Sequence, residues 1–582
     1  MNHAKTPLNR LFEARLATGE ASWFSLPGGA ALFEAGEVAD HIYLLHTGRL
    51  GAFRPDQTHE PQFLGVIRPG EPAGEMSVIS GAPHSGHLVA LRDSEVYALP
   101  REDFLLACEA DPALLTEVAR LMIQRSRQAT SKTSPGEPSV YGFLPVGTAL
   151  PLRPMIEQMA AEIIRLGYSV AVIGKEGERA SREWFSTQER DHDFVLCFAE
   201  ADEGRWQRLV SGQVDRLFRV GRGDSPPPED GRLSPTDPLG SRNLVDLILV
   251  HEPETERPVG SEAWMLSTGA GRLFHLRRDH DGDLQRIVRG LTGQSVGLVL
   301  SGGGARAYAH VGVIKALRER GIPIDFVGGV SMGAVIAAGL AMGWNDTELD
   351  TRIQQAFVRS SPLDDIAFPM LAMTRGRKVA KLLLNHFSDT QFADLWLPFF
   401  CVSSNLTTGA YHVHRRGLLR DALRASISLP GILPPATLGN DVLVDGAVLK
   451  NFPVDVMRAS QLGPIIGVDV SRGRSITASD IIRPASMLKW ILTGQWRKGP
   501  PIVSVLMRAA TVSSGRDILA ARDASDVLVT PDVGGVEIRD WTSYGPAVEA
   551  GHAAMIAALD KLTLPVMDLR RRPSRATLPA QD

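Results

Sequence analysis

One serine stands between glycines at a point where the chain changes from a buried strand to a helix. The run FVGGV, Phe326 to Val330, is strand-like and ends in the pentapeptide GVSMG, whose serine is Ser331; the apolar AVIAAGLAMGW that follows is helix-like. A serine presented on so sharp a turn needs small neighbours, and this context is typical of a nucleophile elbow. A chance pentapeptide in a glycine-rich unit is the alternative. The context favours an α/β fold with Ser331 as a candidate nucleophile.

The same stretch carries no charge over the 19 residues from Phe326 to Trp344, which is long enough for a membrane span. Its five glycines and strand-like start favour a buried strand, turn and helix instead. The first residues, Met1 to Arg15, contain no apolar run that would indicate a secretory signal. We therefore expect a cytoplasmic protein with buried, reduced thiols at its three widely spaced cysteines, Cys108, Cys197 and Cys401.

A glycine cluster follows the preceding strand-like run, VGLVL. Gly302, Gly303 and Gly304 come directly before a helix-like stretch. With Ala307 they also satisfy G-x-G-x-x-A, and Asp325 stands about where a ribose-binding acid belongs, so a dinucleotide site is one interpretation. Bare amides at a helix N-terminus can also stabilise an oxyanion. The elbow on the very next strand favours this second interpretation.

A serine nucleophile needs a base. Asp445 follows the apolar, strand-like Val442 to Val444 and precedes Gly446, so its carboxylate can approach a second strand end closely; a plain Asp-Gly turn is the alternative. The histidines after the elbow lie in polar or amphipathic runs or near the end of the fold: His386, His412, His414 and His552. The sequence therefore predicts a pair of Ser331 and Asp445 without a histidine.

The 582 residues are too many for one core and divide into several regions. Short β-like runs separated by glycine turns, followed by two helices, predict a β-roll with flanking helices over residues 12–128. Alternating strands and helices predict a central α/β domain over 139–293 and a third, α/β domain over 296–565. Residues 566–582 are expected to form a disordered basic tail. The net charge of −4 argues against nucleic acid as a partner.

The third region resembles the patatin-like phospholipase family. Three motifs carry the likeness, and the runs SSNLTTG and ASISLPGILPP lie between the last two: Gly302-Gly303-Gly304-x-Arg306, the pentapeptide around Ser331, and Asp445-Gly446-Ala447. The resemblance covers about Val296 to Met457. It implies that Ser331 is the nucleophile, that Asp445 is its base, and that the glycine-loop amides form an oxyanion hole. Ala307 stands where glycine is usual, which is a mild change for a loop of backbone donors.

The β-rich first region resembles the cyclic-nucleotide-binding domain family. The run GEMSVISGAP, Gly74 to Pro83, is similar to its phosphate-binding cassette, in which Glu75 would take the ribose hydroxyl. Where the family places its phosphate-binding arginine, this chain has His84, which offers one donor and is mostly neutral at pH 7. We expect the fold to be retained, with Glu75 and His84 as candidate ligand residues, but cyclic nucleotides to bind weakly or not at all. A vestigial or protein-sensing module is the alternative.

The three regions in this order resemble the neuropathy target esterase type of lysophospholipase. The resemblance implies a serine esterase that hydrolyses acyl esters of phospholipids or lysophospholipids, without a cofactor or metal, under the influence of its N-terminal domain. A non-catalytic patatin-fold regulator is the alternative, which the intact Ser331 and Asp445 disfavour. Peripheral contact with the inner membrane is expected through Ala485 to Trp496 or the arginine-rich tail, with an ordinary packed helix as the alternative for the first.

Overall fold

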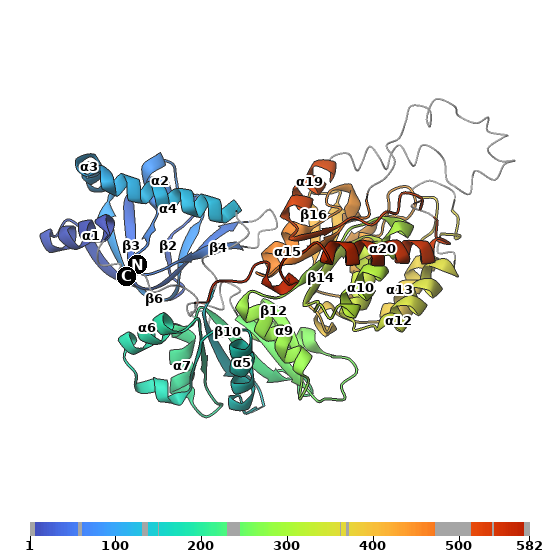
Figure 1. The fold of residues 1–582 in the computed structure, drawn as a ribbon, viewed down its shortest axis with the longest axis horizontal. Helices are drawn as coiled ribbons and strands as arrows, with labels where there is room; N and C mark the ends of the chain where they lie inside the picture. Colours follow the sequence, from blue (N-terminus) through green and yellow to red (C-terminus); the bar gives the residue numbers. More distant parts are fainter. Residues whose placement is uncertain are drawn as a thin grey trace. The chain divides into compact units, whose positions relative to one another are not determined.

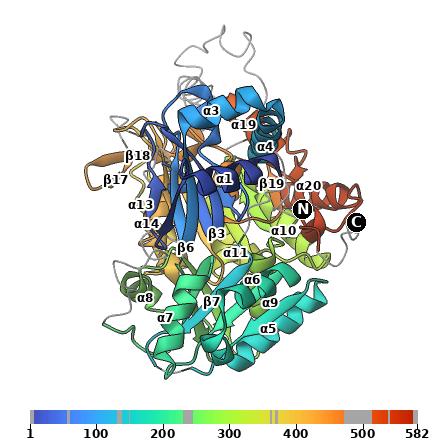
Figure 2. The same ribbon diagram turned by 90° about the vertical axis from the view of Figure 1, so that its left-hand side faces the viewer.

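The computed structural model describes residues 6–55, 61–130, 138–148, 150–229, 245–360, 363–367, 372–471, 514–537 and 540–574. The chain forms two compact units, which are Met1–Glu254 with Ala263–Gly293 and Arg572–Asp582, and Thr255–Glu262 with Gln294–Arg571. Each unit is built on β-sheets covered by helices (Figure 1, Figure 2). The expected fold class, a β-roll followed by two α/β regions, is confirmed.

The first unit begins with an antiparallel roll of six strands, β1 (Ser22–Leu26), β2 (Ala31–Phe33), β3 (His41–Pro55), β4 (Pro61–Ile67), β5 (Pro72–Ala73) and β6 (His87–Pro100). The long strands β3 and β6 pair with each other over most of their length. Helices α1 (Pro7–Thr18), α3 (Arg101–Ala110) and α4 (Pro112–Thr130) lie along the roll in Figure 1. Their apolar side chains, among them Phe12, Phe104 and Val118, close its core.

The central region of the same unit is a six-stranded parallel sheet. Its strands follow the order β12-β11-β10-β7-β9-β8, with bounds β7 (Val140–Pro145), β8 (Val170–Ile173), β9 (Phe194–Phe198), β10 (Arg216–Arg222), β11 (Val245–His251) and β12 (Arg272–Arg277). Strands β7, β9 and β11 are buried at every residue, as parallel strands are when helices cover both faces. Among the described helices, four lie between strands of this sheet, α5 (Arg153–Arg165), α6 (Arg182–Asp191), α7 (Gly204–Gln213) and α8 (Ser261–Thr268), and α9 (Asp281–Thr292) follows β12.

The roll and the central sheet share a buried core. Phe53 and Leu91 of the roll belong to the same apolar cluster as Leu144 and Val195 of the sheet. Two buried arginines of the roll add an ionic layer: Arg49 Nη1 lies 2.8 Å from Asp215 Oδ2, and Arg92 Nη2 donates to Glu189 Oε2 at 2.8 Å. The first two regions therefore pack as one unit, and their separate boundaries stay predictions.

The C-terminal segment is ordered further than expected. Val566 is buried within a short 3₁₀ helix, Val566–Asp568, and Ser574 is buried with its hydroxyl 2.9 Å from the Asp193 carboxylate. The prediction of disorder from residue 566 is therefore wrong as far as 574, because these side chains have buried partners. Residues 575–582, and the expected membrane-contacting stretch Ala485 to Trp496, lie outside the described residues. The three cysteines are free and buried, as predicted.

The second unit holds an eight-stranded mixed sheet. The main order is β17-β18-β15-β14-β13-β19-β20, with β16 also on β15. The strands are β13 (Gly297–Leu300), β14 (Phe326–Val330), β15 (Phe399–Asn405), β16 (Tyr411–His414), β17 (Ala436–Leu438), β18 (Asp441–Asp445), β19 (Ile465–Val468) and β20 (Val527–Val529). The strands from β15 to β20 along that order are parallel, whereas β16 and β18 run antiparallel to β15.

Helices cover this sheet, and two of them cross at close range. Gly312 of α10 (Ala309–Glu319) and Gly551 of α20 (Tyr544–Leu559) each face the backbone of the other helix. A Cβ at Gly312 would lie 1.9 Å from the carbonyl oxygen of Val548, and one at Gly551 would lie 1.9 Å from that of Ala309. The two helices run beside each other in Figure 1. The other α-helices that the structure describes in this unit are α11 (Met332–Ala341), α12 (Asp346–Ile353), α13 (Arg377–Phe387), α14 (Leu419–Ser426), α15 (Val454–Ser460) and α19 (Ser514–Ala524).

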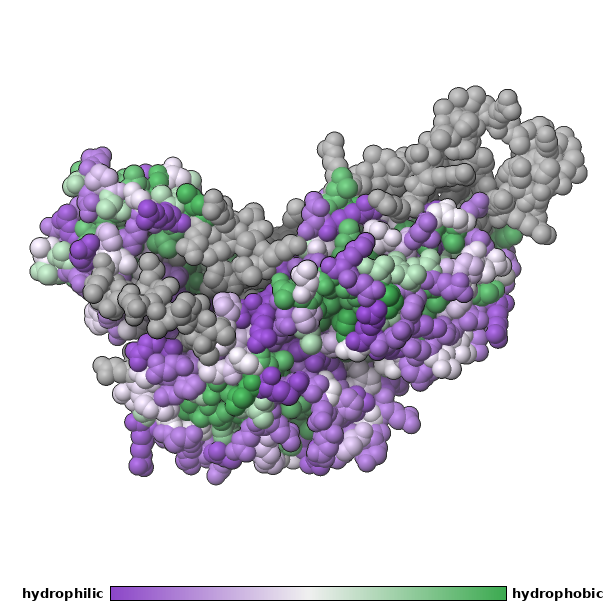
Figure 3. All heavy atoms as spheres, viewed as in Figure 1, coloured by the Kyte–Doolittle hydropathy of each residue, from purple (hydrophilic) through white to green (hydrophobic). Residues whose placement is uncertain are grey.

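The face of the molecule in Figure 3 is mostly hydrophilic, with smaller hydrophobic patches between polar side chains. Within the described part of the chain, every helix is either too short or too polar to cross a bilayer.

Candidate active site

The site lies where two strands meet end to end. On one edge of β15, β14 pairs with residues 399–402 and β18 pairs with residues 403–405. Both must use the same edge, because β16 pairs with residues 401–404 on the other. Since β14 and β18 approach from opposite directions, the ends of the two strands face each other. This arrangement brings Ser331, directly after β14, to Asp445, the last residue of β18.

Ser331 adopts the backbone geometry of an elbow, with φ 55° and ψ −130°. Only a few non-glycine residues of the described chain have positive φ, a conformation that costs a bulky residue free energy. The flanking glycines are required by space: a Cβ at Gly333 would lie 2.4 Å from the carbonyl oxygen of Ser301, and one at Gly329 would lie 2.8 Å from the Gly333 backbone. The predicted strand, elbow and helix are therefore confirmed as a local structure.

Ser331 Oγ donates a hydrogen bond to Asp445 Oδ2 at 2.6 Å. The second carboxylate oxygen, Oδ1, accepts from the amide of Ala447 at 2.9 Å. Asp445 is fully buried, and this burial raises its pKa to about 7, against the opposing effect of the hydrogen bonds from Ser331 and Ala447. A carboxylate with a pKa near neutrality can take a proton from an adjacent hydroxyl and return it.

The glycine loop lies against the serine. A Cβ at Gly302 would lie 2.6 Å from Asn451 Oδ1 and 3.1 Å from the Ser331 Cβ, so a larger residue would force the loop and its neighbours to shift. The Gly302 amide donates to the carbonyl of Asn451 at 3.4 Å, whereas no acceptor within the described residues is recorded for the amides of Gly303 and Gly304. Gly304 begins a 3₁₀ turn, Gly304–Tyr308, that leads into α10. These amides are placed at the start of a helical segment, where donors are free for an anion.

Three further residues hold the site together, and the sequence reasoning missed them. Ser426 Oγ accepts from the Ser331 amide at 2.9 Å, and the Ser428 carbonyl accepts from the Asp445 amide at 2.9 Å. Asn451 Nδ2 donates to the carbonyl of Gly302 at 3.3 Å. The two serines belong to the run ASISLPGILPP, which pointed to the family but not to a role for either residue.

The histidines are engaged elsewhere. His414 Nε2 is hydrogen-bonded to Ser403 Oγ at 2.8 Å, and burial together with His412 lowers the pKa of His414 to about 3. His552 Nε2 lies 2.7 Å from a Glu319 oxygen. In the described structure, no recorded hydrogen bond joins a histidine to Ser331 or Asp445.

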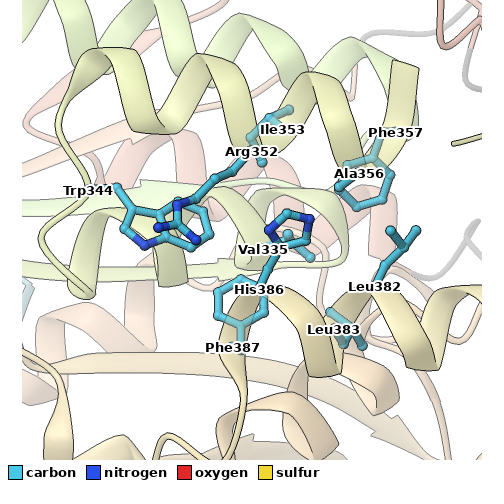
Figure 4. A pocket seen from close by; sticks show the side chains of 10 residues that line it. All are labelled: Val335, Trp344, Arg352, Ile353, Ala356, Phe357, Leu382, Leu383, His386 and Phe387. Atoms are coloured by element: carbon cyan, nitrogen blue, oxygen red, sulfur yellow. The ribbon is translucent and has the colours of Figure 1, made fainter. Parts of the chain in front are cut away.

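A hollow on the helix layer of this unit is lined mainly by apolar side chains (Figure 4). Its walls come from α11, α12, the following π-helical turn and α13, and they include Val335, Ile353 and Phe357. The polar groups at its rim are Arg352, whose guanidinium lies 4.9 Å from the centre of the Trp344 ring, and His386. Its lining includes neither Ser331 nor Asp445.

The candidate nucleotide residues lie in the roll of the first unit. Glu75 begins the short helix α2 (Glu75–Ser80) and is buried. His84 is also buried, and its ring stacks on Phe33 with centroids 3.6 Å apart and planes 8° apart. A Cβ on Gly74 would lie 3.3 Å from the His84 ring, so the imidazole packs against the start of α2. Burial lowers the pKa of His84 below its ordinary value, although Glu37 opposes this shift. The ring is therefore neutral at pH 7.

A metal centre finds no support in the described residues, where no three acidic, histidine or cysteine side chains gather as ligands.

Comparison with known proteins identifies the family of this chain. Residues 298–458 match the family model of the patatin-like phospholipases, and residues 23–111 match that of the cyclic nucleotide-binding domain. An NTE family protein of Mycobacterium tuberculosis is 33% identical over 556 residues, which cover 92% of this chain and 91% of the relative. The chain belongs to the NTE family.

Two animal relatives of the chain are longer. The patatin-like phospholipase domain-containing protein 6 of Mus musculus is 26% identical over 91% of this chain and 44% of its own length. The neuropathy target esterase sws of Drosophila melanogaster is 26% identical over 85% of this chain and 39% of its own length. The family assignment makes this chain a carboxylic ester hydrolase with phospholipid esterase activity.

Proposed function

We propose that this NTE family member hydrolyses acyl esters of phospholipids or lysophospholipids with Ser331 as nucleophile and Asp445 as general base. The observation that carries the proposal is the 2.6 Å hydrogen bond from Ser331 Oγ to Asp445 Oδ2. The elbow geometry of Ser331 and the raised pKa of the buried Asp445 support it.

In the first half of the reaction, Ser331 Oγ attacks the ester carbonyl carbon and its proton passes to Asp445 Oδ2. The carbonyl oxygen gains negative charge, which the amides of Gly303 and Gly304 stabilise; no acceptor among the described residues is recorded for either amide. The bond to the alcohol breaks, and the departing glycerol oxygen takes the proton from the Asp445 carboxyl group. An acyl-serine remains.

In the second half, a water molecule attacks the acyl carbonyl while Asp445 accepts one of its protons. The tetrahedral intermediate uses the same amides. It collapses when Ser331 Oγ leaves and regains a proton from Asp445, which releases the fatty acid and restores the pair. A single carboxylate serves both halves because its pKa of about 7 lets it hold and return a proton near neutral pH.

A fluorophosphonate probe tests the assignment, since it phosphonylates an activated serine and expels fluoride. We expect wild type to be labelled on Ser331 and Ser331→Ala to lose both labelling and ester hydrolysis, by on the order of 10³-fold or more. Ser403→Ala is the matched control, because Ser403 is also buried but bonds to His414. Labelling that persists in Ser331→Ala, or that is lost in Ser403→Ala alone, would contradict the proposal.

For the N-terminal roll we propose that cyclic nucleotides bind only weakly, so that its influence on the hydrolase does not depend on tight binding of these ligands. The family's arginine would supply a permanent charge and two parallel donors to the phosphate, worth about 1.5–3 kcal/mol. The neutral His84, stacked on Phe33, supplies neither. Glu75 and the start of α2 are retained, so the rest of the cassette could still receive a ligand.

Calorimetric titration with cyclic AMP and cyclic GMP tests whether binding is this weak. We expect wild type to bind more weakly than micromolar and His84→Arg to bind roughly tenfold tighter or more. His87→Arg is the control, because it adds the same charge on β6 without replacing His84. Micromolar or tighter binding by wild type would overturn this part of the proposal.

A further inference from the structure

The end-to-end meeting of β14 and β18 leaves a break in the hydrogen bonding along β15. A regular parallel partner would carry its amides and carbonyls on past Val330, but the elbow turns the chain away at Ser331. The Ser331 amide and the Val402 carbonyl lie at this break. An unpaired buried backbone group costs free energy, so both need a partner.

One side chain serves both groups. The hydroxyl of Ser426, at the last residue of α14, accepts from the Ser331 amide at 2.9 Å and donates to the Val402 carbonyl at 2.7 Å. Ser426 is fully buried. Its hydroxyl therefore bridges the two strands where the ladder is interrupted.

The same short segment also holds the base. Two residues further on, the Ser428 carbonyl accepts from the Asp445 amide at 2.9 Å. The nucleophile and the base are thus fixed to one piece of chain, 426–428, although they are 114 residues apart in sequence. A change in this segment changes the distance between them.

We propose that Ser426 is a positioning residue that sets the Ser331–Asp445 hydrogen bond by anchoring the elbow amide to β15; the proposal rests on the catalytic roles proposed above. Ser426 touches the backbone of the nucleophile and does not touch the reacting atoms. Removing its hydroxyl frees the elbow to move away from Asp445, and a displacement of this kind costs up to about 10²-fold in rate.

The test compares three variants with a soluble short-chain ester. We expect Ser426→Ala to lower kcat by roughly 10- to 100-fold with little change in KM, and Ser426→Thr, which keeps a hydroxyl, to recover most of that loss. Ser525→Ala is the control: it removes another buried serine hydroxyl of the same unit, which donates to the Ala521 carbonyl at 2.9 Å. We expect the control to keep the wild-type kcat.

The pH–rate profile separates positioning from loss of fold. The hydrogen bond from Ser331 lowers the pKa of Asp445, and within the described residues no charged side chain shifts it. If Ser426→Ala lengthens that bond, the pKa of Asp445 rises. The part of the profile in which the rate increases as Asp445 ionises then moves to higher pH, whereas Ser525→Ala leaves this rising limb in place. An unmoved limb, or equal loss of kcat in both alanine variants, overturns the proposal. Full activity in Ser331→Ala, measured alongside, would instead overturn the catalytic assignment.

Discussion

Two aspartates of this chain are fully buried in parallel or mixed sheets, yet their surroundings differ. Asp246, in β11 of the central region, accepts from Arg216 at 2.5 and 2.9 Å and from Arg272 at 2.7 and 3.1 Å. Burial would raise its pKa, but the two guanidinium groups outweigh burial and lower it to about 2. Within the described part of the chain no such cation acts on Asp445, and burial raises its pKa to about 7.

The difference separates a carboxylate that supports the fold from one suited to chemistry. A buried charge between two arginines stays ionised and holds neighbouring strands together, because removing it would leave two cations unpaired. A buried carboxylate with only a hydroxyl and an amide as partners keeps its affinity for a proton. Burial alone therefore does not make a carboxylate reactive; the pKa of Asp445 is raised because no cation among the described residues offsets its burial.

The largest expected effect comes from Asp445→Asn. The amide can keep a hydrogen bond to Ser331 but cannot accept its proton, so we expect kcat for ester hydrolysis to fall by on the order of 10³-fold or more. Asp441→Asn is the matched control, since it makes the same change at the other end of β18, where Asp441 accepts from Asn405. Comparable loss in the control, or a kcat within tenfold of wild type in Asp445→Asn, would show that Asp445 is not the base.

Much of this site could be predicted from local pattern. The elbow, the glycine loop and the strand before Asp445 are each encoded by a short run of residues, because glycines and apolar runs determine the local backbone conformation. The joining of β14 and β18 along one edge of β15 could not be predicted this way. It depends on an antiparallel strand, β18, that follows the parallel strand β14 along the same edge of β15. It also depends on Ser426, whose contact with the Ser331 amide forms only in the folded chain.

The first unit shows the same limit. Short strands and glycine turns predicted the roll, and alternating elements predicted the central sheet. That the two share a core was not predictable, since Arg49 and Arg92 read as surface residues in the sequence. Their partners, Asp215 and Glu189, lie more than 90 residues further along the chain. Ser574 was missed for the same reason, because its partner Asp193 is 381 residues away.

The next largest effect is expected from Asp246→Asn. It leaves Arg216 and Arg272 facing a neutral amide, so we expect the first unit to lose about 3 kcal/mol of stability at pH 7. Urea unfolding measures the loss. Asp191→Asn is the control, because its ion pair with Arg190 is largely exposed and contributes little. If the two variants unfold alike, the arginines around Asp246 do not stabilise its charge.

Asp445→Asn should change stability in the opposite direction. A carboxyl whose pKa is raised in the folded state destabilises the fold as pH rises from the unfolded value near 3.9 to about 7, and the cost remains above that. We expect the variant to be more stable than wild type by about 2 kcal/mol at pH 8, on the order of half the full linkage, because a buried amide has its own desolvation cost. Near pH 4 the linkage has almost disappeared and only the cost of the buried amide remains, so the variant should there be no more stable than wild type. A gain that is the same at both pH values would contradict the raised pKa.

The smallest effect is the pH dependence of catalysis in the wild-type protein. Asp445 must be ionised to accept the Ser331 proton, so kcat/KM should rise about tenfold per pH unit below its pKa of about 7 and level off above it. A paired carboxylate such as Asp246, with a pKa of about 2, would give no limb in this range. Single replacement of His386, His412, His414 or His552 by asparagine should leave this rising limb in place. The recorded hydrogen bonds of His414 and His552 lead to Ser403 and Glu319, and none in the described structure joins a histidine to Ser331 or Asp445. If one of these replacements removes the limb, a histidine acts as the base and Asp445 would be its orienting partner.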